Sequence, residues 1–260
     1  MSSKSLTKIV EFLDEILLTS TTPDYPAAFN GLQLANSGSV TKLAAAVDFS
    51  SQAIKAAIAE KANLMIVHHG MFWAGVQPLV GPGYARLRQL LDADIAVYSS
   101  HLPLDKHPQL GNNTLLAKAL GLEPAQEFAR FKDVFIGVQG TCDTDTATLI
   151  ERARNFSRSN GGEAIVTPGL RPDQRTRRWA ICTGAGASAE TLTEATQRKI
   201  DTLIVGEGAH WTAVEAMERG ITIIYLGHYA SETLGVQALT AEVAHHFELP
   251  WTNISAPTGL

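Results

Sequence analysis

The chain has 260 residues, of which 45% are hydrophobic and 18% are charged, and its formal net charge is −5. This composition is typical of a globular protein with a substantial core and predicts one large domain or two smaller ones. The acidic balance argues against a general nucleic-acid-binding protein, because neutralising phosphates requires clustered Lys and Arg. The densest basic stretch, Arg171 to Arg178, is interrupted by Pro172 and Asp173, so we interpret it as a solvated loop.

Cysteine content and apolar runs exclude further classes of protein. Cys142 and Cys182 are the two cysteines, and no CxxC pair is present, so neither a disulfide scaffold nor a thiolate metal site is expected. The N-terminus lacks the apolar region of a signal peptide, and no apolar run approaches about 18 residues. We therefore expect a soluble, cytoplasmic protein that does not contact a membrane.

Strand-like and helix-like segments alternate along the chain. The first part predicts a helix at 5–19, a strand at 43–48, a helix ending at 62, a strand at 64–68, a helix at 84–91, a strand at 95–99 and a helix at 113–120. After a pause near 122–125, the second part predicts strands at 134–139, 164–166, 179–183, 202–205 and 221–225, with helices at 145–156, 187–199, 211–219 and about 230–247. This alternation predicts an α/β fold with mainly parallel sheets.

Histidines and carboxylates follow three of these predicted strands. His68 and His69 end the run Leu64–Val67, Asp105 follows the strand at 95–99, and His228 and Glu232 follow the strand at 221–225. Open α/β sheets place ligands at the carboxyl ends of strands, and His with carboxylate is a ligand set for Zn, Fe or Mn. The sequence therefore predicts a metal site at these strand ends.

Local geometry makes this set compatible with one site. His68 and His69 can point together only where the strand ends and the backbone turns, and Gly70 permits that turn. His228 and Glu232 are spaced i, i+4, so at a helix start they face the same way. Three imidazoles and two carboxylates exceed what one tetrahedral zinc needs, which suggests two divalent ions about 3.5–4 Å apart. The alternative is that these are packed or solvated side chains without a metal.

Other residues near the predicted strand ends are candidates for chemistry. His101 and Glu207 are candidate catalytic residues for proton transfer, or alternatively they orient the metal ligands. The glycine-containing turn from Thr183 to Ser188 is either a tight turn or a cradle for a substrate phosphate or carboxylate. Trp73 could stack on a ring, although core or interface packing is the commoner role of such a residue.

A resemblance to a known family becomes specific at this point. The matching segments are Asn30–Gln33, Val67–Gly70, His101–Asp105, Gly111–Asn113, Gly206–Glu207 and Gly227–Glu232. In order and spacing they resemble the Nif-three-like dinuclear-metal-centre hexameric proteins, many of which are called type 2 homologues of GTP cyclohydrolase I. The resemblance implies that His68, His69, Asp105, His228 and Glu232 bind two metal ions. It also implies a homo-hexameric ring with the metal sites facing an internal cavity.

The expected domain organisation follows from the metal site. Because the segment from His228 to Glu232 must meet His68 and Asp105, the C-terminal helix should return to the first lobe. We therefore expect a discontinuous metal-binding lobe from residues 1–122 and 222–260, and a second α/β lobe from residues 123–221.

Two classes of function remain open from the sequence. The leading hypothesis is a dinuclear-metal-dependent hydrolase acting on a small anionic or nucleotide-like substrate, with GTP cyclohydrolase-like chemistry implied by the resemblance alone. The alternative is a non-catalytic hexamer for metal binding, storage or regulation. Neither function calls for a membrane or nucleic acid as partner.

Overall fold

The computed structural model describes residues 3–260, which fold into two compact units. Of the described residues, unit 1 consists of 3–104 and Gly235–Ala256, and unit 2 consists of Asp105–Leu234 and Pro257–Leu260. The sequence suggested a first lobe of residues 1–122 and 222–260. Residues 105–122, 222–234 and 257–260 instead belong to unit 2. The structure assigns residues 105–122 to unit 2, because Leu116, Leu120 and Leu122 belong to a hydrophobic core built on the sheet of that unit. Within residues 3–260, no helix is both long and apolar enough to cross a membrane.

Unit 1 is built around a five-stranded sheet with the strand order β13-β4-β5-β6-β2. Its strands are β2 (Gly31–Leu34), β4 (Leu43–Asp48), β5 (Leu64–His69), β6 (Ala96–Ser99) and β13 (Trp251–Asn253). Strands β13, β4, β5 and β6 are parallel, and β2 pairs antiparallel with β6. The short strands β1 (Lys4–Ser5) and β3 (Ser39–Val40) form a separate antiparallel pair.

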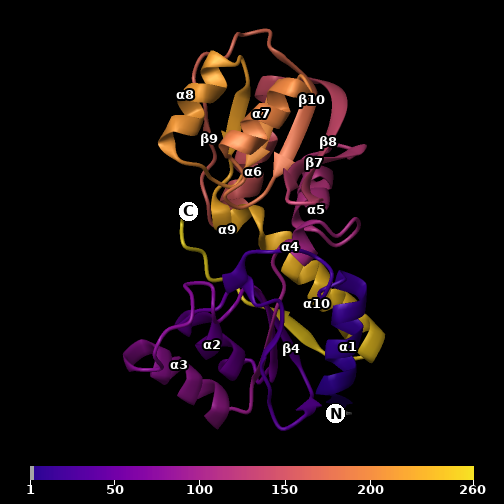
Figure 1. Cartoon of the computed structure of the whole chain (residues 1–260), viewed down its shortest axis with the longest axis vertical. Helices are drawn as coiled ribbons and strands as arrows, with labels where there is room; N and C mark the ends of the chain where they lie inside the picture. The colour runs from indigo at the N-terminus through magenta and orange to yellow at the C-terminus, as the bar shows by residue number, and fades with distance from the viewer. Residues whose placement is uncertain (1–2) are drawn as a thin grey trace. The chain divides into compact units, whose positions relative to one another are not determined.

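Helices cover both faces of the unit 1 sheet (Figure 1). They are α1 (Leu6–Leu17), α2 (Ser51–Ala59), α3 (Gly81–Asp92) and α10 (Thr233–Phe247), together with the 3-10 turn η1 (Pro26–Ala28). Ile54 of α2 and Leu90 of α3 share a core with Met65 and Val67 of β5. Because helices lie on both sides, the residues of β5 are buried on both faces, which explains its uninterrupted apolar sequence up to His68.

Unit 2 is built around a six-stranded mixed sheet with the strand order β7-β8-β10-β11-β12-β9. Its strands are β7 (Gln126–Phe131), β8 (Val134–Asp145), β9 (Ile165–Val166), β10 (Arg175–Cys182), β11 (Thr202–Val205) and β12 (Thr222–Tyr225). The central strands β10, β11 and β12 are parallel, whereas β7, β8 and β9 are paired antiparallel.

Two hydrophobic cores lie on opposite faces of the unit 2 sheet. The helices of this unit are α4 (Leu102–Asp105, which begins at the end of unit 1), α5 (Asn112–Ala119), α6 (Thr146–Ser159), α7 (Ala189–Gln197), α8 (His210–Glu218) and α9 (His228–Ser231). Leucines of α5 and α6 pack with Ile181 and Ile204, and residues of α7 and α8 pack with Leu203 and Val205. Successive side chains of the central strands therefore point into the two cores in turn, because consecutive residues of a strand face opposite sides of the sheet.

The α/β fold class predicted from the sequence is confirmed, with corrections at the sheet edges. Strand β8 continues to Asp145, six residues beyond the predicted end, because β10 pairs with it as far as Asp145. The edge strands β2, β7 and β13 were not predicted. The last predicted helix is interrupted at Glu232, which separates the single turn α9 from α10.

Candidate metal centre

Strand β5 brings His68 and His69 together at its carboxyl end. Their rings lie 4.7 Å apart between centroids, and both residues are buried. The Nδ1 atom of His68 lies 2.8 Å from the backbone oxygen of Ser100, and that of His69 lies 2.8 Å from Oδ1 of Asp48. The ring of His69 is therefore held by Asp48 at the end of β4, and the ring of His68 is held by Ser100, which directly follows β6.

His101 joins this pair from the end of β6. Its backbone N–H donates to Asn30, and its Nδ1 lies 2.8 Å from Oδ1 of the buried Asp24. The ring centroid of His101 is 5.0 Å from that of His68 and 5.7 Å from that of His69. One ligand atom from each of the three histidines lies within 4.8 Å of the others, a spacing that can hold a metal ion.

The hydrogen bonds also fix the tautomer of these rings. A backbone carbonyl or an ionised carboxylate accepts a hydrogen bond but cannot donate one, so the Nδ1 atoms of His68, His69 and His101 each carry the proton. In a neutral imidazole, Nε2 then keeps its lone pair. Metal-binding histidines in proteins almost always donate their other ring N–H to such an oxygen. The donor chemistry of this cluster therefore fits a divalent metal.

His228 and Glu232 form a second group, in unit 2. The loop after β12 turns at Gly227, where φ is +92°, and α9 begins at His228. Nε2 of His228 lies 3.2 Å from Oε2 of Glu232, which confirms that this i, i+4 pair faces the same way. Nδ1 of His228 lies 2.9 Å from Oε1 of Glu207. Burial lowers the pKa of His228, but the carboxylates of Glu232 and Glu207 raise it further, to about 9.

Glu207 therefore acts on His228 as Asp48 and Asp24 act on their histidines in unit 1. This contact matches the orienting role that the sequence left open for Glu207. Its side chain is also 45% exposed and faces a cleft of about 340 Å³ whose lining includes Tyr225, His210 and Gly208. One carboxylate oxygen of Glu207 therefore contacts His228, and the side chain is also accessible to solvent.

Asp105 is also buried in unit 2, at the end of α4. Its Oδ1 accepts a hydrogen bond of 2.9 Å from Nδ2 of Asn112, and the hydroxyl of Thr183 lies 3.5 Å from the same oxygen. Asn113 holds the backbone on both sides, since it donates to the carbonyl of Asp105 and accepts from the N–H of Thr183. The motif Gly111–Asn113 thus fixes Asp105 in place.

Four backbone N–H groups of the turn from Thr183 to Ser188 are already hydrogen-bonded within the protein. The N–H groups of Thr183, Gly184, Ala187 and Ser188 all donate to groups within unit 2. Gly184 has φ of +62°, and a Cβ there would collide with the carboxylate of Glu232. The glycine is needed so that the backbone can pass close to Glu232.

Gly70 also has a different role from the one expected. Its φ does not lie in the left-handed region, but a Cβ at this position would collide with the side-chain amide of Gln33. Gln33 accepts a hydrogen bond from the N–H of Met71 and donates to the carbonyls of Ala28 and Phe29. The close approach of Gln33, rather than an unusual backbone conformation, requires glycine after His69.

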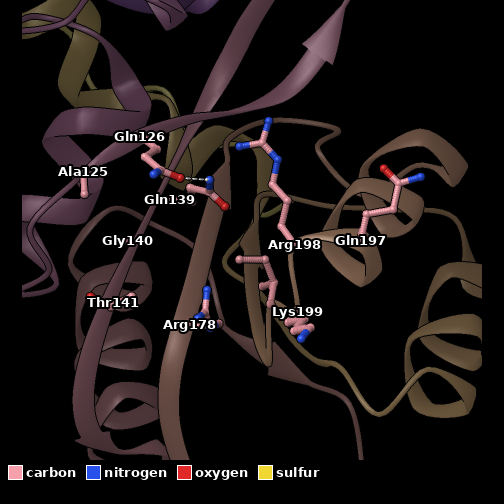
Figure 2. A pocket seen from close by; sticks show the side chains of 10 residues that line it. Ala125, Gln126, Gln139, Gly140, Thr141, Arg178, Gln197, Arg198 and Lys199 are labelled. Atoms are coloured by element: carbon pink, nitrogen blue, oxygen red, sulfur yellow. Dashed lines mark hydrogen bonds between the residues drawn. The ribbon is translucent and has the colours of Figure 1, made fainter.

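A larger cleft in unit 2 is lined by other residues (Figure 2). It has a volume of about 710 Å³, and its lining includes Arg178, Arg198 and Lys199 together with a hydrogen bond from Gln139 to Gln126. The cleft contains none of the predicted metal ligands among the described residues that line it. Its chemistry is that of a basic surface groove.

Sequence reasoning missed the residues that orient the histidines. Asp24, Asp48 and the carbonyl of Ser100 each fix one ring, yet they carry no shared spacing with the histidines in the sequence. Asp48 was detectable in retrospect, because it ends the strand that neighbours β5 and pairs with His69 in register. Asp24 gave no such signal, since it lies in a turn 77 residues before His101.

Comparisons with known proteins give a consistent result. The sequence model of the family described as Duf34/NIF3 (NGG1p interacting factor 3) matches residues 4–257. A Deinococcus radiodurans protein named GTP cyclohydrolase 1 type 2 homolog is 36% identical over 253 residues, covering 97% of this chain and 94% of the relative. A Pyrococcus abyssi protein of the same name is 38% identical over 255 residues, covering 97% of this chain and 98% of the relative.

A solved structure extends this similarity to the fold. Protein ybgI, described as having unknown function, superposes with a TM-score of 0.88 at 30% sequence identity. The match covers 99% of this chain and all of that one. The similarity therefore spans both units.

Proposed function

The chain belongs to the Duf34/NIF3 family, and we propose that it is a metal-dependent hydrolase acting on a small anionic or nucleotide-like substrate. The observation that carries the proposal is the set of three histidines in unit 1, His68, His69 and His101, whose Nδ1 atoms each face an oxygen, which makes Nε2 the atom suited to a metal. A packed structural histidine needs no such uniform arrangement. The nucleotide-like substrate rests only on the names of the relatives.

We propose His68, His69, Asp105, His228 and Glu232 as the ligands of two divalent ions, which can be Zn, Fe or Mn. This ligand set comes from the sequence and from the donor chemistry of each unit. When bound, such ions supply Lewis-acid activation for hydrolysis. Asp48 and Glu207 would hold the imidazoles of His69 and His228 in the tautomer that ligation needs.

Metal content tests this proposal directly. Protein purified without chelator should contain about two ions per chain. Glu232→Gln should lose metal, whereas Glu242→Gln, which changes an exposed glutamate of α10 in the same way, should not. One ion per chain in the wild type, unchanged by Glu232→Gln, would rule out the two-metal form. No ion in either protein would remove the basis for a metal-dependent activity.

His101 and Glu207 are proposed to transfer protons during hydrolysis. Asp24 holds the Nδ1 proton of His101, so Nε2 is the atom that would accept or return a proton. Glu207 has an oxygen on His228 and a side chain that reaches solvent. His101→Ala and Glu207→Ala should each reduce kcat by about 10²–10⁴, as is typical for loss of a general acid or base.

The metal content of the same variants separates two roles. Loss of an orienting residue weakens metal binding by about 10–100-fold, so saturating metal should restore occupancy without restoring turnover if these residues move protons. His245→Ala, an exposed histidine of α10, is the matched control. If His101→Ala removes metal stoichiometrically, then His101 is a ligand. If metal-loaded wild type turns over none of a panel of nucleotides and phosphoesters, the non-catalytic function is favoured.

A further inference from the structure

Trp73 packs directly on the histidine cluster of unit 1. Its ring centroid lies 4.4 Å from that of His101 and 4.7 Å from that of His69. The side chain nevertheless remains 37% exposed. One part of the indole therefore touches the imidazoles, and the rest is open to a ligand.

Two more exposed aromatic residues pack against neighbours of this tryptophan, namely His101 and Phe72. Tyr25 is 51% exposed, and its ring centroid is 6.0 Å from that of His101. Phe29 is 50% exposed and packs against Phe72, the residue before Trp73, at 5.0 Å. The segment from Met71 to Ala85 contains no charged residue. Exposed aromatic groups that converge on a candidate site indicate a binding surface, because single exposed apolar residues are normally scattered.

We propose that Trp73 is a stacking platform for a planar heteroaromatic ring of the substrate. This inference rests on the proposed function, to which it adds a substrate class and a specificity-determining residue. Indole presents a broad apolar face with few rotatable bonds and stacks on the π-face of nucleobases. A ring stacked on Trp73 would lie beside His101, the residue proposed to transfer protons.

The position of Trp73 favours a small ligand over a macromolecular partner. Its contacts are with the two imidazoles themselves, so whatever covers the exposed part of the indole also approaches the candidate ligand atoms. A second copy of the chain on this surface is the alternative that the experiment must distinguish.

The test compares ligands with and without a ring on the protein as purified with its metal. Guanosine 5′-monophosphate and inosine 5′-monophosphate carry the ring, and ribose 5-phosphate is the matched ligand without it. Binding is measured by calorimetry under conditions without turnover, so the result does not depend on hydrolysis. The ring-bearing ligands should bind about 5- to 150-fold more tightly, since stacking on one base contributes about 1–3 kcal/mol.

Variants then assign the ring preference to Trp73. Trp73→Leu should remove most of it, a loss of roughly 5- to 100-fold, and Trp73→Phe should retain part because phenyl still stacks. Trp251→Leu is the control, because Trp251 lies in the same unit and has the same exposed fraction of 37%. Metal content and circular dichroism should match the wild type in all three variants.

Specific outcomes would overturn this inference. They are equal binding of ribose 5-phosphate and the nucleotides, no binding of any probe, and a ring preference that survives Trp73→Leu. A Trp73→Leu protein that dissociates in light scattering while retaining its ring preference would show that the surface is a subunit contact. If Trp73→Leu fails to fold, the wild type and Trp73→Phe still test the inference. Nucleotide should quench indole emission in the wild type and should not do so in Trp73→Phe. Failure of hydrolysis alone would count against the proposed function and leave this binding result intact.

Discussion

Replacement of Asp24 by asparagine should loosen both the fold of unit 1 and the histidine cluster. The buried carboxylate accepts four hydrogen bonds, from Nδ1 of His101, the N–H of Tyr25, Nδ2 of Asn30 and the N–H of Leu102. The first two reach Oδ1 and the last two reach Oδ2. An asparagine offers one oxygen and one NH2 group, so its NH2 group must face two hydrogen-bond donors that a carboxylate oxygen had accepted from.

The arrangement of the asparagine amide that costs least determines how far the free energy of unfolding should fall. If its NH2 group faces His101, the imidazole can shift its proton to Nε2 and accept at Nδ1, which leaves the N–H of Tyr25 without its partner. Tyr25 is an exposed residue, so water can replace this partner, and the free energy of unfolding should fall by about 0.5–1.5 kcal/mol, the net contribution of a typical hydrogen bond. The same shift removes the Nε2 lone pair of His101. Loss of this orientation should weaken metal binding by about 10–100-fold if His101 belongs to the metal site.

The effect of Asp24→Asn should also depend on pH. Burial raises the pKa of Asp24, but the hydrogen bonds from His101, Asn30 and Tyr25 together hold it below its ordinary value of 3.8. A carboxyl whose pKa is lower in the folded state contributes stability above pH 3.8 and loses it as the pH falls through the folded pKa. The difference in unfolding free energy between wild type and Asp24→Asn should therefore be constant near neutral pH and shrink below about pH 3.8.

Urea unfolding of the metal-free protein and chelator competition for the loaded protein measure these two effects. Asp92→Asn is the matched control, because Asp92 is 58% exposed and pairs with Arg88 on the surface of α3. Such exposed pairs contribute about 0–1 kcal/mol, so this variant should change little. If Asp24→Asn unfolds within about 0.5 kcal/mol of the wild type and binds metal equally well, the role assigned to Asp24 is wrong.

Three further predictions concern the metal site and the assembly. Gly184→Ala should lower the metal content, whereas Gly220→Ala should not. Both positions have a similar positive φ and so comparable backbone strain, but a Cβ at position 184 would meet Glu232 and a Cβ at position 220 would not. Equal metal contents in the two variants would contradict this prediction. Chelation should lower the melting temperature, because the bound metal no longer stabilises the folded state. It should leave the far-ultraviolet circular dichroism at about 25 °C unchanged, because both units have extensive hydrophobic cores. Unfolding on chelation would refute this prediction. The resemblance to the hexameric family predicts six chains of 27.9 kDa in light scattering, and a stable monomer at micromolar concentration would exclude that assembly.

The sequence alone determined the elements and residues whose signals are local. The strands at 43–48 and 202–205 were predicted with their observed bounds, because an uninterrupted apolar run of that length needs cover on both faces. His68 and His69 were recognisable since they end such a run, and the proximity of His228 to Glu232 followed from their spacing. In each case the decisive residues are neighbours along the chain.

Only the tertiary structure decided which groups hold the histidines and how the sheets end. The oxygens that fix His69, His68 and His101 come from residues 21, 32 and 77 positions away, and no local pattern records such a distance. The edge strands β2, β7 and β13 likewise exist through pairing with strands elsewhere in the chain. Hydrogen-bond partners are chosen by position in space, so the orientation of each imidazole became visible only once the chain had been folded.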